Sequence, residues 1–231
     1  MPEWWSYGLA DAQIFSARAY DHLVERCMRQ AWPAQPLATV LGLMVLVLLW
    51  RRPVSGTRAM AATAALGCGA VAAWWLPHCY AELHWATGWM TAGFALQALL
   101  LAAAAAWPGA LQRADSAGAR TCATVMLAFA LTLLPWLSMP AGSSGWRAEF
   151  IGLMPAPSIA ASLAVVPLVA PRWRLLLLPL PLAGTLLEAV TLASIDRAQW
   201  MLLPLQAMAL AAILLALRCR RPSGRAQPRR G

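Results

Sequence analysis

The sequence predicts an all-α integral membrane protein, a helical bundle of about seven transmembrane helices with an N-terminal amphipathic helix on its outer face. The first observation behind this prediction is composition. Of the 231 residues, 61% are hydrophobic and only 12% are charged, about half the charge of a soluble domain. The second is length, because the apolar residues form seven runs near the roughly 20 residues that a helix needs to cross about 30 Å of hydrocarbon. The runs are residues 32–50, 59–76, 85–107, 121–139, 150–170, 175–195 and 200–217.

The third observation is the placement of arginine, which accounts for all 18 basic residues. Five arginines lie on one side of the seven runs: Arg18, Arg26, Arg29, Arg147 and Arg197. Thirteen lie on the other side: Arg51, Arg52, Arg58, Arg113, Arg120, Arg172, Arg174, Arg218, Arg220, Arg221, Arg225, Arg229 and Arg230. Because arginine-rich connections stay in the cytoplasm, this distribution predicts an N-terminus outside and a C-terminus inside the cell. Seven spans fit that parity.

These boundaries divide the chain into three parts. Residues 1–31 form an extracytoplasmic segment, residues 32–217 the seven-span bundle, and residues 218–231 a basic, disordered cytoplasmic tail. Six arginines in the tail predict contact with anionic lipid head groups of the bilayer. The net charge of +9 does not indicate a nucleic-acid partner, because the arginines lie at the ends of apolar runs.

The first part contains a predicted amphipathic helix. Ser16 is a plausible N-cap, and Tyr20, Cys27 and Met28 recur at helical spacing while charged residues occupy the other faces. This pattern predicts a helix that lies on the outer leaflet. The alternative is a plain extension of the first apolar run.

Tryptophans lie near the ends of the runs, which is typical of indole side chains at the membrane–water interface. These residues are Trp50, Trp74, Trp75, Trp85, Trp107, Trp136, Trp173 and Trp200. Their positions support the boundaries that hydropathy gives.

The stretch "LPHCYAELHW" is the strongest candidate for a metal site. It holds His78, Cys79, Glu82 and His84 at the predicted outer face, and imidazole, thiolate and carboxylate groups suit zinc or copper. Their spacing matches no strict metal motif, so a structural polar turn is the alternative. Cys27 lies on the same predicted face, where disulfides persist, and a Cys27–Cys79 bridge remains an open possibility.

Polar residues inside the apolar runs predict a substrate site, because such residues are costly in a bilayer. Glu188 is the one acidic residue well inside a run, and Thr185 lies three residues before it. Gln97 falls near mid-depth of the third run, and Gln35 and Gln206 fall in the outer parts of the first and seventh. One interpretation is a proton-coupling or substrate-binding vestibule that opens outward. The other is a neutral glutamic acid bonded to a neighbouring helix.

The fifth run is interrupted. Pro155 and Pro157 stop a helix that would pass through Met154, and Ser158 is a fair cap for a new one. A helix over 158–170 would be about 20 Å long, too short to cross a bilayer. Either the preceding piece dips in as extended chain, or the run is a broken helix whose free amides line a solute site together with Ser158.

Three stretches resemble a family of uncharacterised small bacterial multi-pass membrane proteins, a domain of unknown function sometimes labelled a major-facilitator-type permease. They are "PEWWSYGLADAQIFSARAYDHLVERCMRQAWPAQP", "LHWATGWMTAGFALQALLL" and "EFIGLMPAPSIAASL". The resemblance implies a helical bundle in the bacterial inner membrane and carries over no catalytic residue or substrate.

Two functional hypotheses follow from these observations. The first is a small-solute or ion permease with a polar site in the outer half of the bundle. The second is a non-transporting accessory or assembly subunit of a membrane complex, with metal handling on the outer face as one potential role. The expected protein partner is either a second copy of this chain or a larger membrane complex. No catalytic motif or nucleotide loop is present, so neither enzymatic activity nor a cofactor is predicted.

Overall fold

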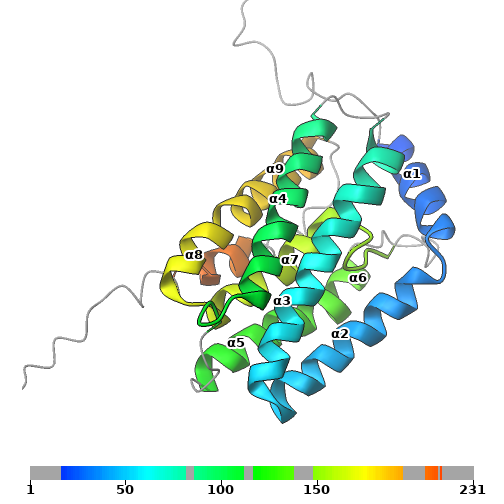
Figure 1. The fold of residues 1–231 in the computed structure, drawn as a ribbon. Coiled ribbons are helices and arrows are strands. Elements are labelled where there is room, and N and C mark those ends of the chain that lie inside the picture. The colour runs from blue at the N-terminus through cyan, green and yellow to red at the C-terminus, as the bar shows by residue number, and fades with distance from the viewer. Residues whose placement is uncertain are drawn as a thin grey trace, which may run out of the picture.

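The computed structural model describes residues 17–81, 86–111, 117–137, 148–194, 206–212 and 214, and these residues form helices and no named strand. The helices pack as a bundle in which α3 and α4 run side by side (Figure 1). In chain order the elements are α1 Ala17–Gln30, α2 Ala34–Arg51, α3 Pro53–Ala70, η2 Val71–Tyr80, α4 Thr87–Ala106, α5 Ala117–Ala128, η3 Phe129–Leu133, α6 Leu134–Leu137, α7 Pro155–Val165, η5 Val166–Leu168, α8 Pro171–Leu177 and α9 Pro179–Ser194.

Within the described residues, five helices are long and apolar enough to cross a membrane: Ala34–Arg51, Pro53–Tyr80, Thr87–Ala106, Ala117–Leu137 and Pro171–Thr191. They correspond to the first four predicted runs and the sixth. The fifth run is a shorter apolar helix, Pro155–Leu168. Most of the seventh run and the predicted tail, residues 218–231, lie outside the described residues. The all-α class is therefore confirmed, and the number seven stays a prediction.

The outer surface of the bundle is apolar. Leu37, Met44 and Val47 of α2 are each more than half exposed, as is Leu186 of α9. Soluble monomeric proteins rarely expose so broad an apolar surface. In a bilayer, this surface would contact lipid acyl chains. Trp107 and Trp136 are 60% and 73% exposed at helix ends, as predicted for interfacial side chains. Trp75, in contrast, is 1% exposed and belongs to the protein interior, which corrects the prediction for that residue.

Two of the spans change to π-helical geometry beside a proline. The second span does so over Val71–Tyr80, which contains Pro77, and the fourth over Phe129–Leu133, just before Pro135. Proline lacks an amide hydrogen and its ring collides with the carbonyl one turn earlier. A wider turn accommodates that ring without ending the helix, so both spans continue to their full length.

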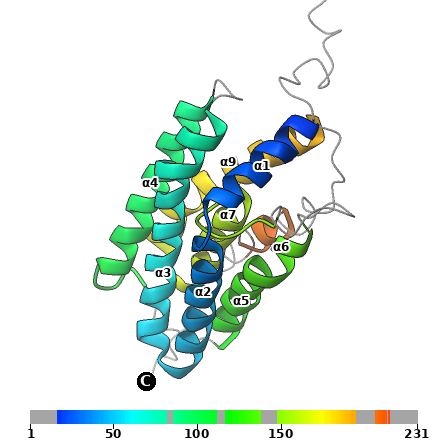
Figure 2. The same cartoon turned by 90° about the vertical axis from the view of Figure 1, so that its right-hand side faces the viewer.

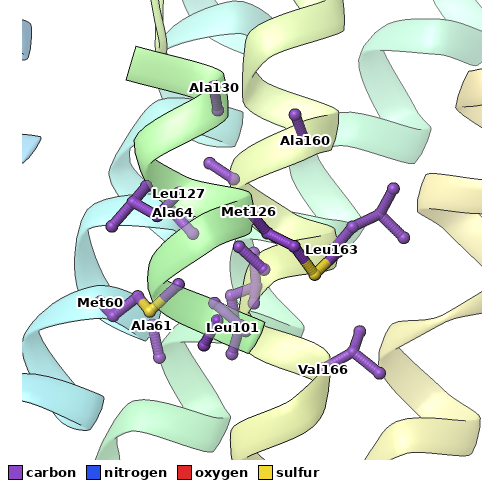
Figure 3. Packing of buried hydrophobic residues seen from close by; sticks show 14 of the residues in the cluster. Met60, Ala61, Ala64, Leu101, Met126, Leu127, Ala130, Ala160, Leu163 and Val166 are labelled. Atoms are coloured by element: carbon purple, nitrogen blue, oxygen red, sulfur yellow. The ribbon is translucent and has the colours of Figure 1, made fainter. Parts of the chain in front are cut away.

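Helix α7 forms the centre of the bundle and contacts α3, α5 and α9. Every residue from Pro155 to Val169 is buried. Figure 3 shows Ala160 and Leu163 of α7 and Val166 of η5 among side chains from α3, α4 and α5, several of which are alanines. Small residues let membrane helices pack backbone to backbone. A helix too short to cross a bilayer is thus held inside the protein and not among lipids.

The segment before α7 explains how the fifth run is interrupted. Gly152 has φ +82°, a conformation that favours glycine, and it packs against Gly67 of α3. The Ser158 hydroxyl closes this turn by accepting a bond from the Gly152 amide and donating one to the Met154 carbonyl, both at 2.8 Å. The helix begins at Pro155 and not at the predicted cap, so Ser158 is a turn-closing residue inside the first helical turn.

Helix α1 confirms the predicted amphipathic helix but not its contact with lipid. Its apolar face, with Tyr20, Val24 and Met28 buried, packs on Trp75 and Leu76 of η2. The helix lies at one end of the bundle (Figure 2). Its apolar stripe therefore covers protein, because η2 offers a complementary apolar surface.

The arginine-bearing ends predicted to share one side do lie together. Arg120 lies 4.8 Å from the ring of Trp50, and Trp50 donates a 3.1 Å bond to Thr124. The Ala170 amide bonds to the Ala110 carbonyl at 2.8 Å, beside Arg172 and Arg174. The first pair of contacts joins the C-terminal end of α2 to the start of α5, and the third joins the segment after α4 to the residue before α8. Helix α1 lies at the opposite end of the bundle (Figure 1).

Arg174 is predicted to be important for stability. It is 3% exposed, and its guanidinium donates to the carbonyls of Val169 and Pro167 at 2.9 and 3.4 Å, where the α7–η5 helix ends. Arg174→Met keeps the side-chain bulk and removes these bonds, so we expect a loss of about 2 kcal/mol. Thermal unfolding in detergent, followed by tryptophan fluorescence, measures it. Arg172→Met, at an exposed position of the same helix, is the control, and equal shifts for the two variants would contradict the role.

Candidate functional site

A cavity of about 240 Å³ lies between α4 and α9, which pack side by side over α7. It is partly open at the surface, where Trp89 is 80% exposed at its edge. The outer surface of these helices is apolar, so in a bilayer this opening would face lipid chains. The lining residues are Cys68, Ala86, Trp89, Met90, Gly93, Phe94, Gln97, Ile159, Ser162, Leu180, Pro181, Ala183, Gly184 and Leu187.

Gln97 is the main polar group of this cavity. It is 3% exposed, and its Nε2 donates to the Leu177 carbonyl at 3.3 Å. A carbonyl accepts only, so this bond fixes which end of the amide is nitrogen. The Oε1 atom is buried and accepts no bond from any described residue. A buried acceptor without a donor costs about 1–3 kcal/mol, which is unusual in a folded protein.

A cysteine and a serine form a second polar point in the wall. The Ser162 hydroxyl donates to the Ser158 carbonyl at 2.9 Å. Its oxygen lies 3.2 Å from the Cys68 sulfur. Since the serine hydrogen is already used, the thiol is the donor of this pair.

A second, shallower hollow on the outer face of α3 and α4 is a weaker candidate. Its lining is mainly alanine and glycine. Thr91, a hydroxyl in that lining, donates to the Thr87 carbonyl at 2.8 Å and so needs no ligand. Among the described residues, the α4–α9 cavity thus combines shape with an unmet polar group.

The residues predicted to line one vestibule are separated in the structure. Gln35 donates to the Met28 carbonyl at 2.7 Å, where α1 meets α2. Gln206 donates to the Thr185 carbonyl at 3.2 Å, and the Thr185 hydroxyl bonds within α9 to Leu182. Ser158 closes the turn before α7. Of the predicted substrate residues, Gln97 is the one that lines the cavity.

Glu188 lies one residue beyond the cavity wall on α9. The Tyr80 hydroxyl hydrogen-bonds with the Thr191 side chain and lies within electrostatic range of the Glu188 carboxyl. Residues 188 and 191 are three apart and so share a helix face. The structure thus places Glu188 near polar side chains of η2 and of its own helix.

The residues of the predicted outer-face metal site are not all available as ligands in the structure. Cys79 is joined to Cys27 in a disulfide whose Cα atoms are 6.3 Å apart, so it has no thiolate to offer a metal. The exposed His78 contacts the Trp74 carbonyl at 3.1 Å. Glu82 and His84 lie outside the described residues. In the described part of the chain, no three His, Cys, Asp or Glu side chains gather as a metal site.

The free amides predicted at the start of the broken helix are fewer than expected. The first four residues of α7 are Pro155, Ala156, Pro157 and Ser158, and proline has no amide hydrogen. Two of the four unsatisfied donors of a helix start are therefore missing. This lets the helix begin in an apolar interior and makes a poor anion site.

The sequence offered little to identify the remaining polar groups of the cavity. Cys68 and Ser162 lie in apolar runs that pack face to face, and they are 94 positions apart. The i, i+4 spacing of Ser158 and Ser162 was a usable signal, since it places two hydroxyls on one helix face. The chain matches no protein-family model, no curated protein and no solved structure.

Proposed function

We propose that this protein binds a small, membrane-soluble molecule in the cavity between α4 and α9. The observation that carries the proposal is that Gln97 lines this cavity while its buried Oε1 atom has no donor among the described residues. Ligand sites in proteins are mostly apolar hollows with a few placed polar groups, and this cavity has that composition.

The proposal keeps one part of the permease hypothesis and changes another. It retains a solute site with Gln97 as a binding residue. It moves the site from an outward-open vestibule to a lateral cavity, because Gln35, Ser158, Thr185 and Gln206 have partners elsewhere. Passage of the molecule across the membrane remains a prediction, as does the role of an accessory subunit.

The arginine distribution supports an orientation with the N-terminus outside the cell, and the resemblance of three stretches to small bacterial membrane proteins supports a bacterial inner membrane as the location. The Cys27–Cys79 disulfide is consistent with that orientation, because it lies at the predicted outer end and disulfides persist outside the cytoplasm.

Filling the cavity tests the proposal. A Cβ atom at Gly93 would meet nothing within 4 Å, so Gly93→Leu places its side chain in the cavity without a backbone clash. The probe is a diazirine-bearing alkane in proteoliposomes, with cross-links mapped by mass spectrometry. We expect labelling concentrated on the 89–97 and 180–187 segments of the wild type, and at least about five-fold weaker labelling there in Gly93→Leu, which corresponds to about 1 kcal/mol.

Gly88→Leu is the matched control. It lies on the same helix, a Cβ there also meets nothing within 4 Å, and it does not line the cavity. The proposal fails if the two variants are labelled alike, or if cross-links in the wild type spread evenly over all lipid-facing helices.

A further inference from the structure

The cavity that carries the proposed function also indicates the chemistry of its ligand. None of its described lining residues is charged. A charged group placed among them would lose its hydration and gain no counter-ion, which is strongly unfavourable in an apolar surrounding. The ligand that fits is therefore neutral.

The polar groups of the wall favour a donor on the ligand. The Gln97 amide nitrogen donates one of its two hydrogens to the Leu177 carbonyl, and the oxygen is the atom of this side chain that has no partner among the described residues. Ser162 has given its hydrogen to the Ser158 carbonyl, and Cys68 gives its own to Ser162. Ser162 and Cys68 can therefore act toward a ligand only as hydrogen-bond acceptors. A ligand carbonyl would leave the Gln97 oxygen without a donor, whereas a ligand hydroxyl would supply the partner that this oxygen lacks among the described residues.

Size and access limit the rest of the molecule. A dry cavity of about 150 Å³ holds benzene, so about 240 Å³ accommodates a ring or a short length of chain. The exposed edge at Trp89 and Leu187 faces the lipid phase, which lets a longer tail stay among the acyl chains.

We infer that the cavity binds a neutral, largely apolar alcohol, taken up from the bilayer with its hydroxyl donated to Gln97 Oε1. This inference rests on the proposed function and narrows it to one class of ligand. The acceptor at Gln97 selects the hydroxyl head, and the apolar wall between α4 and α9 holds the adjoining carbons.

Competition against the diazirine-bearing alkane tests the inference in the same proteoliposomes. The competitors are dodecanol, 2-dodecanone, dodecanoate and dodecane, each titrated over the same range of mole fractions in the bilayer. One net hydrogen bond changes an affinity by roughly two- to ten-fold, so we expect dodecanol to halve labelling at about one fifth of the concentration that the other three require. Gln97→Met keeps the side-chain length and removes the acceptor, and should abolish the advantage of dodecanol.

Gln206→Met is the matched control, because Gln206 also donates to a backbone carbonyl but lies outside the cavity. It should leave the advantage intact. Equal competition by all four compounds overturns the choice of an alcohol, as does a better result with the ketone or the carboxylate. Those outcomes leave the cavity itself standing if Gly93→Leu still prevents labelling. Loss of the dodecanol advantage in Gln206→Met as well as in Gln97→Met also overturns the inference.

Discussion

Gly56→Ala is expected to destabilise the protein by at least about 3 kcal/mol, because the new methyl group would overlap backbone and not side chain. Only Arg52 separates α2 from α3, and the chain turns back so tightly there that a Cβ at Gly56 would collide with the Cα and amide nitrogen of Leu49. A flexible side chain could move away, but the backbone of a packed helix cannot do so without opening the α2–α3 hairpin. Thermal unfolding in detergent measures the loss.

Gly69→Ala is the control for that substitution. Gly69 lies on the same helix, and its added Cβ would approach Ala98 at 3.9 Å, an ordinary contact. Alanine is also the better helix former by about 1 kcal/mol, so this variant should be neutral or slightly stabilised. A similar loss in both variants would show that the close approach at Gly56 does not limit stability.

Cys27→Ser is expected to cost about 2–4 kcal/mol and to free α1 from the bundle. The disulfide closes a loop with a sequence separation of 52, and cross-links over loops of that length stabilise by restricting the unfolded chain. The apolar face of α1 remains able to pack on η2, so the helix should loosen before the rest of the bundle unfolds. Hydrogen exchange of the 17–30 segment, together with the unfolding temperature, measures both effects.

Cys122→Ser serves as the control, since Cys122 is a half-buried free thiol. It should change neither measurement, and reduction of the wild type with dithiothreitol should reproduce the behaviour of Cys27→Ser. Unchanged hydrogen exchange of α1 in Cys27→Ser would mean that the apolar contacts alone hold the helix in place.

The site could be predicted from sequence only in part. Gln97 was identified because an amide inside an apolar run is costly wherever it lies. Gln35 and Gln206 gave the same signal, yet each has a backbone carbonyl beside it. The number of bonds that a polar side chain makes depends on the helix packed against it. A hydropathy pattern does not show which neighbouring group will bond to a polar side chain. The three glutamines therefore looked alike in the sequence, although one lines the cavity and the other two have structural roles.

The sequence alone predicted a helical chain with seven apolar runs and a fifth run interrupted by prolines. The all-α class and five of those runs, as helices long and apolar enough to span a bilayer, are confirmed in the described residues. Those properties depend on local geometry and on the cost of moving side chains out of water. The tertiary structure decided that α7 is enclosed, that α1 covers η2 and that Trp75 is buried while Trp74 is half-buried. A protein interior and a bilayer are both apolar, so only the packing of one helix against another distinguishes them.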